Sequence, residues 1–134
     1  QTKGNISVNT NKEICYLGHK NALKNYLSLE DNILLMELNE HPDLKKYIEI
    51  LGFNKLLDVN VANLSYGQQK KLALLRLFLN ESDLIVLDEP LVGLDKETQE
   101  ILNNFLVDQL NKNKAVIYSS HISCPIDSKE LLLK

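Results

Sequence analysis

An apolar run at positions 84 to 87 that ends in two acidic residues constrains the fold of this chain more than any other feature. Short continuous apolar runs are typical of strands that are buried on both faces of a parallel sheet. Asp88 and Glu89 follow at the carboxyl end of the run, where open α/β sheets place their ligands. Adjacent carboxylates repel each other unless a cation lies close to them. The sequence therefore predicts an α/β fold with a ligand site at the end of this strand.

Three polar motifs accompany this strand in a fixed order along the chain. Upstream, Ser65 and Gln68 form a capping-box pattern that opens an apolar helix. The free N–H groups and the positive end of the dipole make such a helix start a site for anions. Downstream come Gly93-Leu94-Asp95, whose last residue is placed to cap another helix, and then Ser119-Ser120-His121 after a further apolar run.

This combination resembles the ATPase domain of ABC transporters, which are P-loop NTPases. The motifs match, in order, the signature motif, the Walker B motif, the D-loop and the switch histidine of that family. The resemblance implies that ATP is the substrate and that Asp88 holds Mg²⁺. It also implies that Glu89 is the general base that polarises the attacking water, and that His121 contacts the γ-phosphate.

The signature motif and the D-loop imply a head-to-tail homodimer. In the family, the amino end of the signature helix contacts the ATP that is held by the opposite subunit. The residues that the resemblance places at this contact are Ser65, Gly67, Gln68 and, in the D-loop, Asp95. The family usually has glycine where this chain has Tyr66, so the chain departs from the motif at its variable third position.

A second departure lies near the amino end, at the place of the family's Q-loop glutamine, which contacts Mg²⁺ and the attacking water. His19 stands there, and the resemblance gives it the role of metal ligand. The stretch Tyr16-Leu17-Gly18-His19, followed by residues 27–32, resembles the ATP-binding subunits of haem exporters in cytochrome c maturation. This likeness implies transmembrane permease partners and a peripheral location on the cytoplasmic face of the inner membrane.

The resemblance implies one partial ABC ATPase domain over residues 1–134. Residues 27–80 are expected to form a helical subdomain that includes the signature helix, and residues 1–26 and 81–134 a sheet-containing catalytic core. The expected strands are 4–8, 13–17, 84–87, 115–118 and, at the edge, 129–133. The expected helices are 28–38, 42–50 with Gly52 closing it, 65–79 and a helix from Asp95 to about residue 110.

Composition excludes several classes of protein. The formal net charge of −3 offers no basic surface for nucleic acid, so none is expected as a partner. No apolar run reaches the length of a membrane span. The two cysteines lie far apart in the chain, and Cys15 sits in an apolar strand, which favours a buried reduced thiol.

The motif G-x-x-x-x-G-K-[ST] does not occur in these 134 residues. Its backbone and lysine cradle the β- and γ-phosphates in P-loop NTPases. In the family this motif and its helix precede the Gly-x-Ile strand, which here is Gly4-Asn5-Ile6. We therefore expect this chain to be a fragment of an ATPase, and to be inactive on its own.

Two alternatives from other classes stay open at this point. The chain is compatible with a degenerate half-domain that binds a partner without hydrolysing ATP. It is also compatible with the C-terminal half of a split ATPase head of the DNA-repair type, whose C-terminal lobes lack the P-loop as well. Those heads follow long heptad coiled coils, and residues 1–61 contain no sustained heptads, which disfavours the second alternative.

Overall fold

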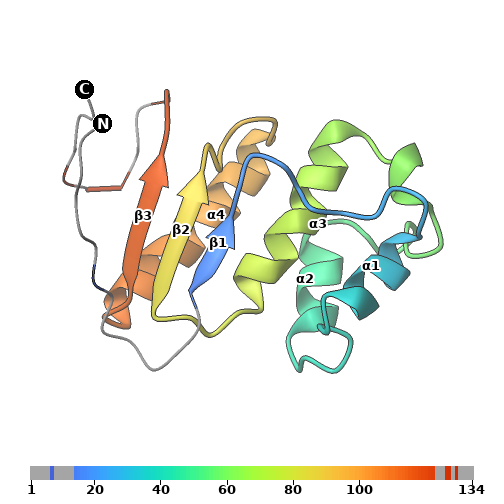
Figure 1. Cartoon of the computed structure of the whole chain (residues 1–134), viewed down its shortest axis with the longest axis horizontal. Coiled ribbons are helices and arrows are strands. Elements are labelled where there is room, and N and C mark those ends of the chain that lie inside the picture. Colours follow the sequence, from blue (N-terminus) through green and yellow to red (C-terminus); the bar gives the residue numbers. More distant parts are fainter. Residues whose placement is uncertain (1–6, 8–13, 123–125, 128, 130–134) are drawn as a thin grey trace.

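A computed structural model describes residues 7, 14–122, 126–127 and 129, and its centre is a three-stranded parallel sheet. The strands β1 (Cys15–Leu17), β2 (Leu84–Asp88) and β3 (Ala115–Ser119) lie side by side in that order (Figure 1). Their carboxyl ends share one edge, where Asp88 pairs with Ser119. The predicted strand 4–8, the edge strand 129–133 and Cys124 fall wholly or largely outside the described residues.

In Figure 1, α4 lies behind the strands, and α1, α2 and α3 lie to the right of β1. Their bounds are α1 Leu29–Leu35, α2 Leu44–Ile50, η1 Val61–Asn63, α3 Tyr66–Phe78 and α4 Lys96–Asn111. Among the described residues, none of these helices has the length and apolar character that a membrane crossing requires.

The predicted starts of α3 and α4 are confirmed, whereas α2 begins two residues after the predicted residue 42. Ser65 accepts a hydrogen bond from the Gln68 amide at 3.2 Å, and the Gln68 side chain accepts one from the Ser65 amide at 2.8 Å, which completes the capping box. Asp95 caps α4 by accepting from the amide of Thr98 at 2.8 Å. Each cap satisfies amide groups that the helix leaves without a partner in its first turn.

Two helices end in the same motif with different residues. Behind α2, the amide of Phe53 donates to the carbonyl of Ile48 at 2.8 Å while Gly52 takes the left-handed conformation, with φ at +76°. Behind α1, Glu37 takes that place with φ at 58°, so α1 stops three residues before the predicted end at Leu38. The periodicity could not predict this stop, because glutamate is not a residue that favours the left-handed conformation.

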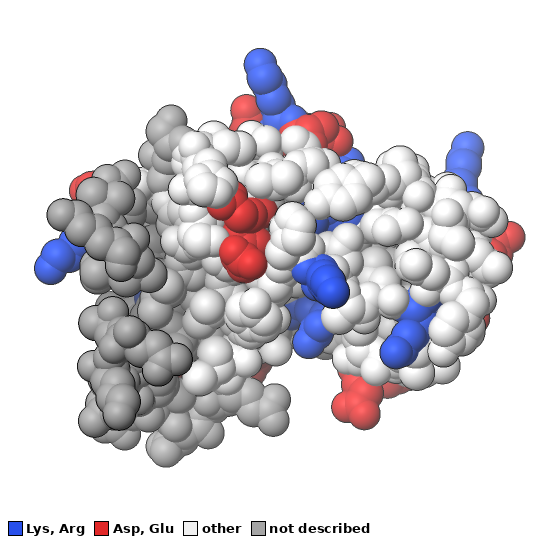
Figure 2. Space-filling model, turned by 45° about the horizontal axis from the view of Figure 1, so that its top comes forward, with Lys and Arg blue, Asp and Glu red and all other residues white. Residues whose placement is uncertain are grey.

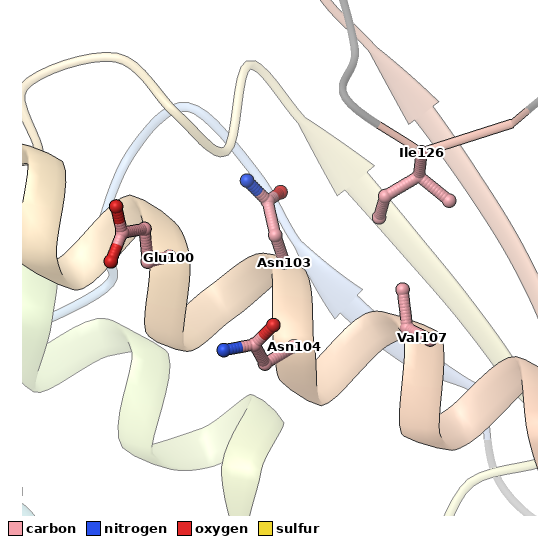
Figure 3. Close-up of a pocket in the computed structure, with 5 residues that line it drawn as sticks. All are labelled: Glu100, Asn103, Asn104, Val107 and Ile126. Carbon is pink, nitrogen blue, oxygen red and sulfur yellow. The ribbon is translucent and has the colours of Figure 1, made fainter.

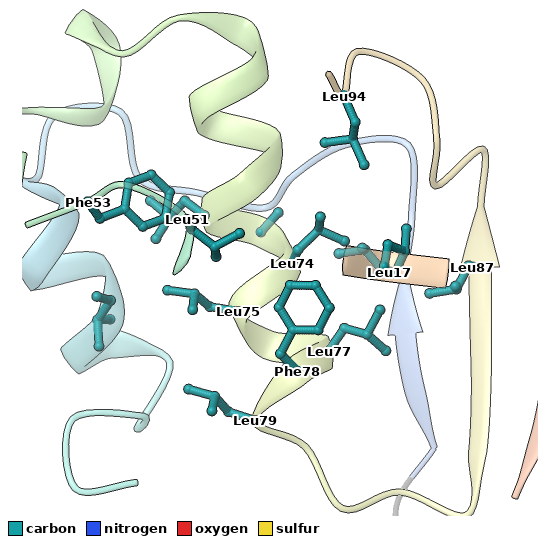
Figure 4. Close-up of a cluster of buried hydrophobic side chains, with 14 of the residues drawn as sticks. Leu17, Leu51, Phe53, Leu74, Leu75, Leu77, Phe78, Leu79, Leu87 and Leu94 are labelled. Carbon is teal, nitrogen blue, oxygen red and sulfur yellow. The ribbon is translucent and has the colours of Figure 1, made fainter. Parts of the chain in front are cut away.

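The core joins α3 to the sheet. Leu74 and Leu77 of α3 lie near Leu17 and Leu87 of the strands in Figure 4, and all four are buried. The prediction of a helix that is apolar nearly all round is confirmed, since α3 buries seven of its residues. Burying one leucine side chain contributes roughly 1.5–3 kcal/mol, so this contact is a main source of stability.

The predicted burial of strands on both faces is wrong for much of the sheet. Ile85 and Leu87 are buried, but Val86 between them is only half-buried. Tyr16 of β1 and Ile117 of β3 are both 59% exposed on that second face. Within the part of the chain that the structure describes, α3 and α4 both pack on the same face of the sheet. An apolar run predicts a strand, but it does not reveal whether another segment covers each face of that strand.

A buried asparagine ties the segment after β1 to the helices. Asn32 of α1 accepts from the amide of Lys24 at 2.8 Å and donates to the carbonyls of Lys24 and Ser28 at 3.0 and 2.9 Å. A backbone hydrogen bond joins this segment to the residues before α3, since the amide of Val61 donates to the carbonyl of Leu27 at 2.9 Å. The segment that begins at the end of β1 is thereby fixed against the start of α3.

The two helix ends provide a matched test of backbone strain. A Cβ at Gly52 would meet no atom within 4 Å, so Gly52→Ala adds left-handed strain without a clash. We expect Gly52→Ala to lower the free energy of unfolding by about 1 kcal/mol in urea melts. Glu37→Gly, at the equivalent place after α1, should instead leave stability unchanged or raise it by up to about 1 kcal/mol. Equal losses in both variants would contradict this account.

Candidate functional site

The register between β2 and β3 brings a serine against both acids. The hydroxyl of Ser119 donates to Oδ1 of Asp88 at 2.6 Å and accepts from the amide of Glu89 at 3.1 Å. The carbonyl of Ser119 accepts from that same amide, also at 3.1 Å. Ser119 therefore orients the Asp88 carboxylate and fixes the backbone at Glu89.

The two predicted catalytic residues meet at this edge. Nε2 of His121 lies 3.1 Å from Oε1 of Glu89, and the amide of His121 donates to Oε2 at 3.4 Å. The Glu89 side chain is 16% exposed, whereas the His121 side chain is 94% exposed. Figure 2, in which the upper edge of Figure 1 comes forward, shows a small acidic patch surrounded by uncharged side chains.

Glu89 is held in an unusual backbone conformation. Its φ is 49°, in the left-handed region, and the next residue is Pro90. Side chains other than glycine rarely adopt this conformation, and such strain of about 1–3 kcal/mol persists only where the surroundings enforce it. Here the bonds from Ser119 supply that restraint. Strain of this kind is concentrated at functional sites, which agrees with the predicted role of Glu89.

A lysine that the sequence analysis missed lies behind the acids. Lys70 of α3 is 1% exposed, and burial lowers its pKa, an effect that the charges of Asp88 and Glu89 oppose. The lysine and the two acids therefore influence one another electrostatically. The signal was a lysine within an apolar stripe, since position 70 shares a helix face with Ala73 and Leu74.

The predicted nucleotide-binding residues gather around the start of α3. Ser65, Gly67 and Gln68 form the amino end of the helix. Nζ of Lys71 lies 2.8 Å from Oδ2 of Asp95, which joins the D-loop to the same helix. Hydrogen bonds from Lys71 and from the residue at position 98 hold the pKa of the Asp95 carboxyl well below its usual range.

The remaining predicted residue, His19, is exposed and lies two positions beyond the carboxyl end of β1. In the described part of the chain, no hydrogen bond or ion pair joins His19 to Asp88 or Glu89. Its role as a metal ligand stays a prediction.

The donor set at the strand end suits magnesium. The carboxylate of Asp88 and the hydroxyl of Ser119 are oxygen ligands, which Mg²⁺ prefers, and Mg²⁺ usually takes only one or two carboxylates beside substrate phosphates. The imidazole of His19 is a softer donor and fits Mg²⁺ less well. Among the described residues, no group of three or more His, Cys, Asp or Glu is arranged to hold a metal ion.

A pocket of about 340 Å³ lies between α4 and Ile126. Its lining residues are drawn in Figure 3 and are Glu100, Asn103, Asn104, Val107 and Ile126. None of the predicted site residues lines it, so the carboxyl edge of the sheet remains the candidate site.

Comparison with known proteins agrees with the predicted resemblance to ABC transporter ATPases. The family model described as "ABC transporter" matches residues 1–92, so the chain belongs to the ABC transporter family. The "Cytochrome c biogenesis ATP-binding export protein CcmA" of Gluconobacter oxydans is 34% identical over 116 residues, which cover 87% of this chain and 55% of that protein. The protein of the same name from Rickettsia felis is 35% identical over 133 residues, with 97% and 68% covered.

The solved structures bear on the fold alone. A structure described as "Structure of ATP binding subunit of ABC transporter" superposes with a TM-score of 0.70 at 22% identity. The match covers 81% of this chain and 48% of the other. The predicted α/β fold of an ABC-type ATPase domain is confirmed, and the chain spans 55% of the Gluconobacter relative and 68% of the Rickettsia relative.

The Lys71–Asp95 pair predicts a dependence of stability on salt and pH. Asp95→Asn keeps an oxygen for the α4 cap and removes the charge, so urea melts at pH 7 should show a loss below about 1 kcal/mol that shrinks in high salt. Because the folded pKa of Asp95 is depressed, its contribution is complete above the unfolded value of about 3.9 and declines as pH falls toward the folded value. The difference between the two proteins should therefore shrink below about pH 4.

Asp108→Asn is the matched control, because Asp108 pairs with Lys112 at the same 2.8 Å but both side chains are more than half exposed. We expect a smaller loss there. A loss for Asp95→Asn that changes with neither salt nor pH would contradict the assignment.

Proposed function

We propose that this chain forms the Walker B, signature and switch regions of an ATP-hydrolysing subunit of an ABC transporter. Membership of the family and the geometry of the sheet edge support this proposal. The names of the Gluconobacter and Rickettsia relatives support a role in export for cytochrome c biogenesis, and we propose a haem-related cargo.

The observation that carries the proposal is the pairing of Glu89 with His121 beside Asp88. In the proposed site Asp88, which Ser119 orients, would hold Mg²⁺, which when bound neutralises charge on the phosphates of ATP. Glu89 would take the proton of the attacking water. The imidazole of His121 lies on the exposed side of Glu89, so it can orient that carboxylate and reach toward a γ-phosphate.

The amino end of α3 supplies the second half of the proposed site. Its free amides and dipole favour a phosphate. In the proposed homodimer, Ser65, Gly67, Gln68 and Asp95 of one subunit serve the ATP that is bound by the other. The subunits would dock on transmembrane permease partners at the cytoplasmic face of the membrane, with the helical subdomain of residues 27–80 toward them.

The lack of a P-loop motif within these 134 residues leads to a first test of function. We expect the chain alone neither to bind Mg-ATP at micromolar concentration nor to hydrolyse it, because it has no cradle for the β- and γ-phosphates. Isothermal titration with ATP and a phosphate-release assay check this. The same chain fused behind a segment that carries the G-x-x-x-x-G-K-[ST] motif is the positive arm. Tight ATP binding by the unfused chain would overturn the expectation.

A second test addresses the general base in a subunit that contains a P-loop. Glu89→Gln should leave ATP binding within about twofold and lower kcat by about 10²-fold or more, because the amide cannot accept the proton. Glu49→Gln, on the exposed surface of α2, is the matched control and should leave both unchanged. If Glu89→Gln turns over at the wild-type rate, the base lies elsewhere.

A further inference from the structure

The first residue of α3 is in close contact with the D-loop of the same chain. A Cβ placed on Gly93 would clash with Cε1 of Tyr66 and would lie 2.8 Å from its Cδ1. The edge of the Tyr66 ring therefore packs directly on the backbone of Gly93 and leaves no room for a side chain. Gly93 also has φ at +79°, a conformation that favours glycine.

Two further contacts join the same elements. A Cβ on Gly67 would lie 3.2 Å from the carbonyl oxygen of Gly93, so the backbones approach closely there as well. One turn further along α3, Lys71 pairs with Asp95 at 2.8 Å. The D-loop segment 93–95 is thus held against α3 at three successive points, of which the Tyr66 ring is the only aromatic one.

The held segment leads back to the acid at the strand end. The amide of Val92 donates to the carbonyl of Glu89 at 3.3 Å, and the amide of Leu94 donates to the carbonyl of Leu91 at the same distance. The side chain of Gln99 donates to the carbonyls of Leu91 and Leu94 at 3.3 and 3.1 Å. Residues 89–95 therefore contain two successive hydrogen-bonded turns, together called the 89–95 turn, with Glu89 at one end and the Tyr66 contact near the other.

The Tyr66 side chain is 52% exposed, so its ring adds less buried area than a core residue would. We propose that Tyr66 is a positioning residue, matched to Gly93, whose ring holds the 89–95 turn against α3 so that the start of α3 and Glu89 keep a fixed relative position. The catalytic consequence of this arrangement rests on the proposed ATPase function. The contact itself does not, because it joins two segments of the chain described here.

A double-mutant cycle on the chain tests the matched pair. Gly93→Ala should lower the urea midpoint of unfolding at least twice as much in the Tyr66 chain as in the Tyr66→Ala chain. The left-handed strain at position 93 is common to both backgrounds and cancels in the cycle, which leaves the contact between the two residues. Equal shifts in the two backgrounds would overturn the pairing.

The positioning role is tested by steady-state kinetics in a subunit that contains a P-loop. Tyr66→Ala should lower kcat by about tenfold and leave KM for ATP within twofold, because misplacement acts on the chemical step. Tyr66→Phe keeps the ring carbons that touch Gly93 and should restore the wild-type kcat. A Tyr66→Ala variant with wild-type kcat would overturn the inference, and so would a Tyr66→Phe variant as slow as Tyr66→Ala. An inactive wild-type subunit would instead overturn the proposed function, and the cycle would then decide the contact by itself.

Discussion

The parallel pairing of β2 with β3 is the constraint on which the candidate site depends. Because Asp88 lies opposite Ser119 in the register, one hydroxyl can bond to the carboxylate and to the next amide at once. A shift of one residue would turn Asp88 to the other face and separate these groups. The same register carries His121 to within 3.1 Å of Glu89, so strand pairing brings the proposed metal ligand, the proposed base and the histidine together.

Helix α3 serves both the core and the site. Its buried side supplies the leucines that pack on β1 and β2, and it also includes Lys70, whose pKa is affected by the charges of the two acids. Its amino end carries the capping box and the contacts to the D-loop. A shift of α3 would therefore displace residues at the strand end and at the signature motif together, because both regions are in contact with this helix.

The sheet shows why burial is harder to foresee than secondary structure. The apolar runs in β2 and β3 predicted strands at the right places, and their existence is confirmed. They also suggested burial on both faces, yet Ile117 is largely exposed within the described part of the chain. An apolar side chain indicates that burial would be favourable, but the partner that buries it is a property of another segment.

The sequence by itself determined the capped starts of α3 and α4, the order of the motifs and the place of the two acids at a strand end, because these depend on residues within a few positions of one another. Tertiary structure decided the rest. Ser119 bonds to Asp88 across 31 positions, and the ring of Tyr66 meets Gly93 across 27. Lys70 is likewise buried, and affected by the charges of the two acids, only because α3 packs against the sheet. Local sequence patterns determine each helix and strand, whereas strand register and helix packing determine which distant residues become neighbours.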